Sequence, residues 1–427
     1  MTKIRTRLGR WMAVALVVAA VPGAVSAQVL PGGLPRLPGG GLLERPVERL
    51  TDRVQTLGGT ALQAPSRLRG LIRGSDGALE ADPFGWPVVS GEIVAVGLSD
   101  TARAEAGRLG YGLIREDSLP ELELTVLVLS PPRGQRLIRA VERLAALDPK
   151  AEIDFNHVHT PAGEVAADGV LAPAPSVQAG SRVRLGLIDT GVAAHPALAT
   201  SPIRQQGFAG PVRPAAHGTA VASLMVGRAS AFAGAAPGAS LSVADVYGGT
   251  ATGGSSTALA RALAWMAGQG VEVVNISLVG PRNPVVARAV AQVQARGITL
   301  VAAAGNDGPA APPLYPAAYD GVIGVAAVNG RHRPLPETGR GPQVDYAAPG
   351  ADMAAAGIAG GYVSVRGSSF AAPLVAGLIA RHGQAGLARQ ARDLGAHGRD
   401  DVYGRGLVAA DLAVAPRTVA VRGSLRR

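Results

Sequence analysis

The chain has 427 residues, of which 47% are apolar and 17% charged, so it can form roughly two or three domains with a sizeable core. It contains no cysteine, which excludes disulfides, thiol chemistry and zinc fingers. The formal charge is +10, but the arginines are scattered and aromatic residues make up only 4%, so a basic and aromatic nucleic-acid-binding surface is not expected.

The first 27 residues have the pattern of an export signal peptide. A basic head that includes Lys3 and Arg10 precedes the apolar run 11–21, and Val25-Ser26-Ala27 supplies the small residues of a cleavage site. The apolar run is too short to span a bilayer comfortably, although an uncleaved anchor is the alternative. We therefore expect an exported protein, periplasmic or extracellular, with no stable membrane insertion after the signal is removed.

Residues 28–87 are rich in Gly, Pro and Leu, and this composition opposes long helices. We expect a mostly flexible linker here, with one short amphipathic helix from Leu42 to Leu57.

Residues 88–159 predict a small α+β domain. The expected strands and helices alternate in the order βαββαβ, at 92–98, 100–109, 111–114, 122–129, 135–147 and 151–158. This order is ferredoxin-like. His157 and His159 lie two apart on the last strand and face the same way, as in a metal-binding pair or a solvated strand end. No third ligand is evident, so we predict no metal site and no cofactor.

Residues 160–180 are rich in Ala, Pro and Gly, and this composition predicts an exposed linker. Residues 181–414 are expected to form the next domain. There, continuous apolar strands alternate with helices, which predicts a parallel sheet covered on both faces. The basic tail 415–427 is expected to be mobile. The strands are expected at 183–188, 241–246, 271–276, 298–303 and 322–328, and the helices at 218–227, 255–268, 283–296 and 369–386.

Three chemically active side chains stand at the ends of these elements. Asp189 ends a strand, His217 opens a helix, and Ser369 opens another helix after Gly367. The chain order Asp, His, Ser is one of the known orders for a catalytic triad. A serine at a helix start also lies beside backbone N–H groups that can stabilise an oxyanion. Taken singly, the three residues also suit a turn, a helix cap and an N-cap.

Four motifs in this order resemble the subtilisin-like serine peptidases, or subtilases, over roughly residues 182 to 412. Ala220 and Phe370 stand where that family usually has His and Met. The motifs are Leu187-Ile188-Asp189-Thr190-Gly191, His217-Gly218-Thr219, Ala303-Ala304-Gly305-Asn306-Asp307-Gly308 and Gly367-Ser368-Ser369-Phe370-Ala371-Ala372-Pro373. The resemblance implies a doubly wound, mostly parallel α/β fold and a serine endopeptidase that acts on proteins or peptides.

The resemblance also implies a role for each residue. Ser369 attacks the peptide carbonyl and forms an acyl-enzyme, His217 moves the proton, and Asp189 holds the imidazole. Asn306 donates to the oxyanion together with the backbone N–H of Ser369. A catalytically silent relative and a lipase-type hydrolase are the other classes to weigh, but the complete site opposes the first. The second is opposed by the absence of a G-x-S-x-G motif around Ser369.

By the same resemblance, two segments bind the substrate backbone. They comprise Ser277, Leu278, Val279 and Gly280 in one stretch and Ala303, Ala304 and Gly305 in the other. The family often has glycine at the position of Val279. A valine there predicts a narrow pocket and small residues before the scissile bond, unless its side chain points into the core.

The resemblance finally implies that residues 88–159 are a propeptide that assists folding and inhibits the site. We expect self-cleavage within 160–180, and thus a self-processing zymogen. Residues 228–234 lack the carboxylates and asparagines of a calcium site.

Overall fold

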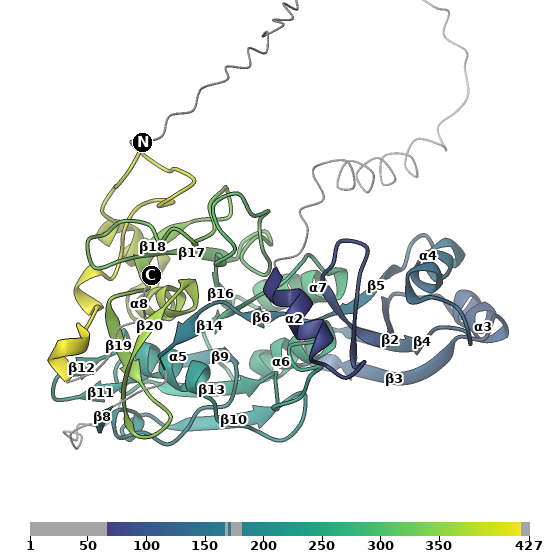
Figure 1. The fold of residues 1–427 in the computed structure, drawn as a ribbon, viewed down its shortest axis with the longest axis horizontal. Coiled ribbons are helices and arrows are strands. Elements are labelled where there is room, and N and C mark those ends of the chain that lie inside the picture. The colour runs from purple at the N-terminus through teal and green to yellow at the C-terminus, as the bar shows by residue number, and fades with distance from the viewer. Residues whose placement is uncertain (1–65, 167–169, 172–181, 420–427) are drawn as a thin grey trace, which may run out of the picture. The chain divides into compact units, whose positions relative to one another are not determined.

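The computed structural model describes residues 66–166, 170–171 and 182–419, which contain a small antiparallel sheet and a large parallel sheet (Figure 1). The expected signal peptide, the helix expected at 42–57 and most of the tail lie outside these residues. Within them, no helix combines the length and apolar character needed to cross a membrane.

The small sheet has the expected ferredoxin-like order. β2 lies between β4 and β5, and β3 forms the edge beyond β4, with every pair antiparallel. Two helices connect these strands as the βαββαβ pattern predicts. The elements are β2 (Pro87–Val96), α3 (Asp100–Arg108), β3 (Gly112–Leu119), β4 (Leu124–Ser130), α4 (Leu137–Leu147) and β5 (Glu152–His157), with the 3-10 helix η1 (Pro120–Leu122) between β3 and β4.

The linker expected over 28–87 is wrong for its last part. α2 (Ser66–Arg73) and β1 (Leu79–Ala81) lie within it, and β1 pairs with the start of β2. Leu79 is buried against Val89 and Val158, with Ile72 of α2 packed on them. Glycine and proline frequency overstated the flexibility here, because a few apolar side chains are enough to dock these short elements onto the small sheet.

The two faces of the small sheet pack on different partners. Along β2, Ile93 and Ala95 face a core shared with α3 and α4, whereas Val94 and Val96 belong to a cluster with two helices of the larger domain. Alternation along a strand therefore lets both faces be buried. The small domain thus uses one face for its own core and the other for docking.

The large sheet is parallel, with the order β10-β13-β9-β14-β16-β17-β18. Its strands are β9 (Arg184–Asp189), β10 (Ile203–Gly207), β13 (Ser240–Asp245), β14 (Val273–Ile276), β16 (Thr299–Ala303), β17 (Ile323–Val328) and β18 (Tyr346–Pro349). The five strands expected from the sequence are present. The two edge strands, β10 and β18, were not expected.

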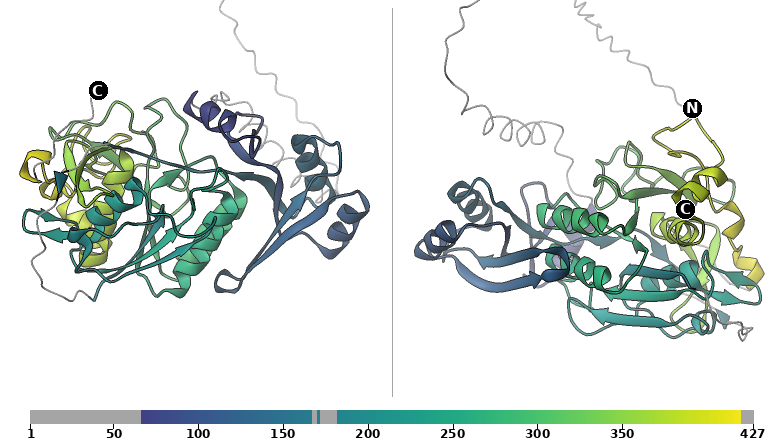
Figure 2. Two further views of the ribbon diagram at one scale, coloured as in Figure 1. Left: turned by 60° about the horizontal axis from the view of Figure 1, so that its bottom comes forward. Right: turned by 180° about the vertical axis from the view of Figure 1, so that it is seen from behind.

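Helices cover both faces of this sheet, as a doubly wound fold requires (Figure 2). One buried cluster joins the sheet to α5 (Ala216–Val226) and α8 (Ser368–Gln390). The other joins it to α6 (Ser256–Gly268) and α7 (Pro284–Ala295), on which the small sheet docks. These are the four helices that the sequence predicts.

Shorter pieces complete the domain. They are the hairpin β19 (Met353–Ala356) and β20 (Gly361–Arg366), the short strands β6 (Thr160–Pro161), β7 (Glu164–Val165), β8 (Val170–Leu171), β11 (Arg228–Ala229), β12 (Phe232–Ala233) and β15 (Leu278–Val279), and the 3-10 helices η2 (Pro196–Leu198), η3 (Ala410–Leu412) and η4 (Pro416–Val419).

Candidate active site

Asp189 at the end of β9 and His217 at the start of α5 are in direct contact. Nδ1 of His217 lies 2.9 Å from both carboxylate oxygens of Asp189, and both side chains are buried. Gly218 permits this approach, because a β-carbon there would lie 2.4 Å from the carbonyl oxygen of Thr190. A carboxylate on Nδ1 fixes the ring orientation and leaves Nε2 for chemistry.

Ser369 is the second residue of α8, and Pro373 follows four residues later. Proline has no N–H to donate to the carbonyl of Ser369. That carbonyl instead accepts a 2.9 Å hydrogen bond from the hydroxyl of Ser277. The hydroxyl of Ser369 in turn donates to the carbonyl of Ser277, also at 2.9 Å.

The structure therefore brings Ser369 and His217 to one cleft without a hydrogen bond between them. Nε2 of His217 is buried and has no hydrogen-bond partner within the described residues. The ring of Phe370, the neighbour of Ser369, lies 5.2 Å from the imidazole between centroids. The acid–base pair is formed, and the serine hydroxyl has a different partner.

Asn306 follows β16 and turns toward the start of α8. Its Oδ1 accepts a 3.0 Å hydrogen bond from the backbone N–H of Ser368, which orients the side-chain amide. A β-carbon at Gly367 would lie 2.6 Å from Nδ2 of Asn306 and 2.8 Å from the carbonyl oxygen of Ala162. The amide of Asn306 and the carbonyl oxygen of Ala162 therefore both lie close to Gly367.

The cleft is occupied by the chain's own segment 159–166. β6 pairs antiparallel with β15, and β7 pairs antiparallel with β20. Between these two pairings, the carbonyl oxygen of Ala162 accepts a 2.9 Å hydrogen bond from the backbone N–H of Ser369. The segment thus runs past Ser369 as an extended strand, held on both sides.

Ala162, whose carbonyl binds Ser369, is enclosed by apolar side chains. The side chain of Ala162 is buried with Val279, Ala303 and Leu314. Val279 thus packs on the segment. Gly305 contributes indirectly, because a β-carbon there would lie 2.6 Å from Leu314.

Of the remaining residues predicted to bind substrate, two lie against the segment and one does not. Leu278 pairs with Pro161, and Gly280 borders His159, from which a β-carbon would lie only 2.5 Å away. Ala304 packs instead with Ala326 and Val344.

The solvated strand end expected for His157 and His159 is wrong, since both are buried. His157 contacts Asp82 at 3.2 Å and the amide of Asn283 at 3.2 Å. Burial lowers the pKa of His157, but the carboxylates of Asp154 and Asp82 together raise it above its ordinary value. The part of the chain that the structure describes holds no cluster of three or more His, Asp or Glu side chains suited to a metal ion.

His159, two residues later, is fully buried. Its backbone N–H donates to the carbonyl of Gly254 at 2.8 Å, and the hydroxyl of Tyr247 donates to its carbonyl at 3.2 Å. Burial, together with the nearby His157, lowers the pKa of His159 to about 3. The docked ring is therefore neutral.

Arg67 of α2 is a contact that the sequence analysis missed. Its guanidinium forms a bidentate pair with Asp307, the residue after Asn306, at 2.8 and 3.1 Å. It also donates to the hydroxyl of Thr160 at 3.1 Å. No local pattern marks an arginine inside a Gly- and Pro-rich region as a partner of the cleft.

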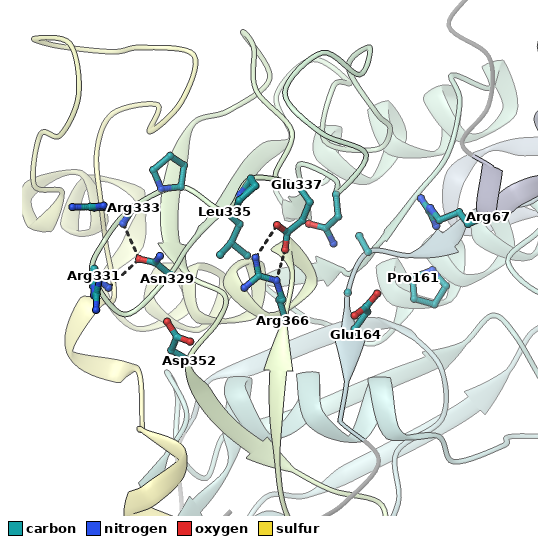
Figure 3. Close-up of a pocket in the computed structure, with 15 residues that line it drawn as sticks. Arg67, Pro161, Glu164, Asn329, Arg331, Arg333, Leu335, Glu337, Asp352 and Arg366 are labelled. Carbon is teal, nitrogen blue, oxygen red and sulfur yellow. Dashed lines mark hydrogen bonds and ion pairs between the residues drawn. The ribbon is translucent and has the colours of Figure 1, made fainter. Parts of the chain in front are cut away.

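Beyond Ala162 the cleft opens into a cavity of about 950 Å³ (Figure 3). Arg366 and Glu337 form an ion pair of 2.6 Å on its wall. Asn329 accepts hydrogen bonds from the backbone N–H groups of Arg331 and Arg333 at the far end. Room therefore exists for a chain that continues past the Ala162–Gly163 bond.

A parallel sheet with an Asp–His pair and a helix-start serine on one rim defines a serine peptidase of the subtilisin type. A model of the Subtilase family matches residues 180–394, and the chain belongs to this family. It is a serine-type endopeptidase, and its substrates are peptides.

Two proteases and one solved structure to which the chain is similar support this family assignment. M-protease of Shouchella clausii (strain KSM-K16) is 29% identical over 70% of this chain and 84% of the relative. Subtilisin Savinase of Lederbergia lenta is 31% identical over 55% of this chain and 91% of the relative. The fold is similar to that of fervidolysin from Fervidobacterium pennivorans, with a TM-score of 0.62 and 21% identity over 77% of this chain. The chain spans 61% of fervidolysin.

Proposed function

We propose that the protein is an exported endopeptidase made as a self-processing zymogen, with Asp189, His217 and Ser369 as its triad. The observation that carries the proposal is the hydrogen bond from the Ser369 N–H to the carbonyl oxygen of Ala162. This hydrogen bond supports Ala162–Gly163 as the bond of the chain itself that the proposed nucleophile attacks. This bond lies within the linker 160–180, where cleavage is expected from the sequence.

The reaction begins with a rotation of the Ser369 side chain. Its hydroxyl leaves the carbonyl of Ser277 and turns to Nε2 of His217, which has no competing partner within the described residues. His217 takes the proton as Oγ attacks the carbonyl carbon of Ala162, and it gives this proton to the departing amine of Gly163. Water then hydrolyses the Ala162 ester on Ser369, which frees the enzyme.

Negative charge on the Ala162 oxygen is stabilised by two donors in this scheme. One is the N–H of Ser369, which already binds this oxygen, and the other is the amide of Asn306 beside Gly367. The N–H belongs to the first turn of α8, where it has no partner inside the helix. The positive end of the helix dipole adds to the effect.

The small domain serves as the propeptide in this proposal, and its described part begins at residue 66 rather than at 88. One face of its sheet is buried against α6 and α7, and this apolar contact holds the small domain on the peptidase domain. The same domain ends in the segment that fills the cleft, so the cleaved product blocks the site until it is released. After cleavage, residues 163–180 precede the peptidase domain in the mature chain, and residues 1–27 direct export.

The experiment compares purified full-length wild type, Ser369→Ala and Ser230→Ala. Wild type is expected to split into two fragments, with Gly163 as the first residue of the larger one. Ser369→Ala should stay intact and fail to react with a serine-directed phosphonate. Ser230, which is exposed, provides a matched control that should behave as wild type.

Two outcomes contradict the proposal. An intact wild-type chain that neither reacts with the phosphonate nor hydrolyses casein would indicate a silent relative. A Ser369→Ala chain that splits at the same bond would remove Ser369 from the nucleophile's role. Export is tested separately, by comparing secretion of the chain with and without residues 1–27.

A further inference from the structure

The residue after the proposed scissile bond, Gly163, has almost no room for a side chain. A β-carbon on it would lie 2.5 Å from Cε2 and 3.1 Å from Cδ2 of Phe370. It would also lie 3.2 Å from the backbone carbonyl oxygen of Arg366. Carbon–carbon contacts below about 3 Å are strongly repulsive, so either the ring or the segment has to move before alanine fits.

The ring of Phe370 has little freedom to move. It is fully buried within the cluster that joins α8 to the sheet. It also lies against the imidazole of His217, at 5.2 Å between ring centroids. A displacement of this ring would therefore disturb core packing and the catalytic base together.

The segment cannot easily move away either. On one side of Gly163 the carbonyl of Ala162 is bound by Ser369, and on the other side Glu164 and Val165 pair with β20. A shift of Gly163 would break one of these attachments. Its backbone does not adopt the left-handed conformation, so space rather than chain geometry selects glycine here.

We propose that Phe370 restricts this protease to bonds followed by glycine. The inference rests on the proposed function, because it takes the Ala162–Gly163 bond as the example of a substrate. Together with the small pocket around Ala162, it defines the substrate class as peptides with a small residue followed by glycine. The cavity beyond Gly163 has room for the residues that follow, so we expect no comparable restriction after the glycine.

The first test uses peptides in trans. Wild-type enzyme that has processed itself is assayed on a synthetic peptide with the sequence of residues 156–166, and on versions with Ala or Leu in place of Gly163. The glycine peptide is expected to have a kcat/KM at least about tenfold above that of the alanine peptide, and the leucine peptide should be slower still. Equal rates for the glycine and alanine peptides would overturn the inference.

The second test assigns the effect to Phe370. Phe370→Met introduces the residue that the family usually has, whose flexible side chain can yield. The ratio of kcat/KM for the glycine peptide to kcat/KM for the alanine peptide should fall by about fivefold or more in this variant. Self-processing of full-length Gly163→Ala should be slow, and Gly163→Ala/Phe370→Met should recover, whereas Ser230→Ala, a change at an exposed residue outside the cleft, should process normally.

The outcomes separate the inference from the function on which it rests. An unchanged ratio in Phe370→Met enzyme that still labels with phosphonate would overturn the role of Phe370. Should this variant fail to fold, the peptide series with wild-type enzyme still decides the glycine preference. A wild-type enzyme that cleaves neither itself nor the glycine peptide overturns the proposed function, and the inference with it.

Discussion

Ser277 and Ser369 exchange hydrogen bonds, each hydroxyl donating to the other's backbone carbonyl at 2.9 Å. The exchange links the residue before β15, which pairs with the segment, to the start of α8. In the proposed mechanism only one of the two bonds breaks, namely the one donated by Ser369. The other, donated by Ser277, satisfies a carbonyl that Pro373 leaves without a helical partner.

The first prediction concerns this second bond. Ser277→Ala leaves the buried carbonyl of Ser369 unsatisfied and should lower the free energy of unfolding by about 1–3 kcal/mol. Ser277→Thr keeps a hydroxyl and should lose less. Thermal unfolding of both variants in the Ser369→Ala background, where the chain stays intact, measures the difference, and equal melting temperatures for Ala and Thr would contradict it.

The second prediction concerns Asn306. Asn306→Ala should lower kcat by about 10²–10³ with little change in KM, a magnitude known from removing one such donor in another subtilase. Asn306→Asp keeps the shape but cannot donate a hydrogen bond, so it should be at least as slow. Steady-state kinetics on a peptide with the sequence of residues 156–166 give both constants. A variant whose KM rises while its kcat is unchanged would argue that Asn306 only binds substrate.

The third prediction concerns the pocket around Ala162. Val279→Gly removes an isopropyl group that packs on this side chain, so the pocket should accept larger residues. Peptides with Leu or Phe in place of Ala162 should gain in kcat/KM relative to the alanine peptide by about tenfold or more, as one or two methylene groups imply. An unchanged order of preference would place the limit on Leu314 or on Ala303 instead.

The strands of the central domain could be predicted because they are continuous apolar runs, as in β9. Of its helices, α6 and α7 begin after the capping residues Ser255 and Asn283. Asp189 and His217 lie at the end of β9 and the start of α5, as expected. The edge strand β10 was missed because its sequence, Ile203-Arg204-Gln205-Gln206-Gly207, is polar, and an edge position tolerates polar residues.

The occupant of the cleft could not be predicted from local sequence. β6 and β7 are two residues each and exist because β15 and β20 offer unpaired edges to them. The role of Gly163 likewise depends on Phe370, which lies far along the chain. Such pairings follow from tertiary structure, and the propensity of a short Ala-, Pro- and Gly-rich stretch contains no trace of them.

The fourth prediction concerns Arg67. Its bidentate pair with Asp307 and its bond to Thr160 fasten α2 to both the enzyme and the segment. Because the arginine side chain is 44% exposed, the pair should contribute only about 0.2–1 kcal/mol. Arg67→Ala should therefore speed release of the cleaved propeptide by about 1.4- to fivefold, measured by the appearance of activity after processing.

The same measurement at raised ionic strength provides a check, because salt should speed release of the wild-type propeptide and have less effect on Arg67→Ala. Arg69, an exposed residue of the same helix, is the matched control. If Arg69→Ala and Arg67→Ala released the propeptide equally fast, helix content rather than the pair with Asp307 would be responsible.

The last prediction concerns pH and His159. Its pKa is lowered to about 3 in the docked segment, so protonation favours the undocked state, in which the pKa is near 6.5. Docking should therefore weaken by about tenfold per pH unit as the pH falls from about 6.5 toward 3. His157 does not oppose this trend, because its raised pKa makes its favourable contribution complete and constant below about 6.5.

Hydrogen exchange of the His159 backbone amide, which donates to Gly254, reports docking directly in the intact Ser369→Ala chain. After correction for the intrinsic pH dependence of exchange, the protection factor of this amide should fall by about tenfold per pH unit as the pH falls from about 6.5 toward 3. His159→Phe keeps a ring in the pocket but removes the titrating group, so its protection should be flat over the same range. Tyr247 stays neutral throughout, because burial raises the pKa of its hydroxyl. A slope shared by both chains would assign the effect to another group, and a flat wild-type profile would show that the docked ring accepts a proton.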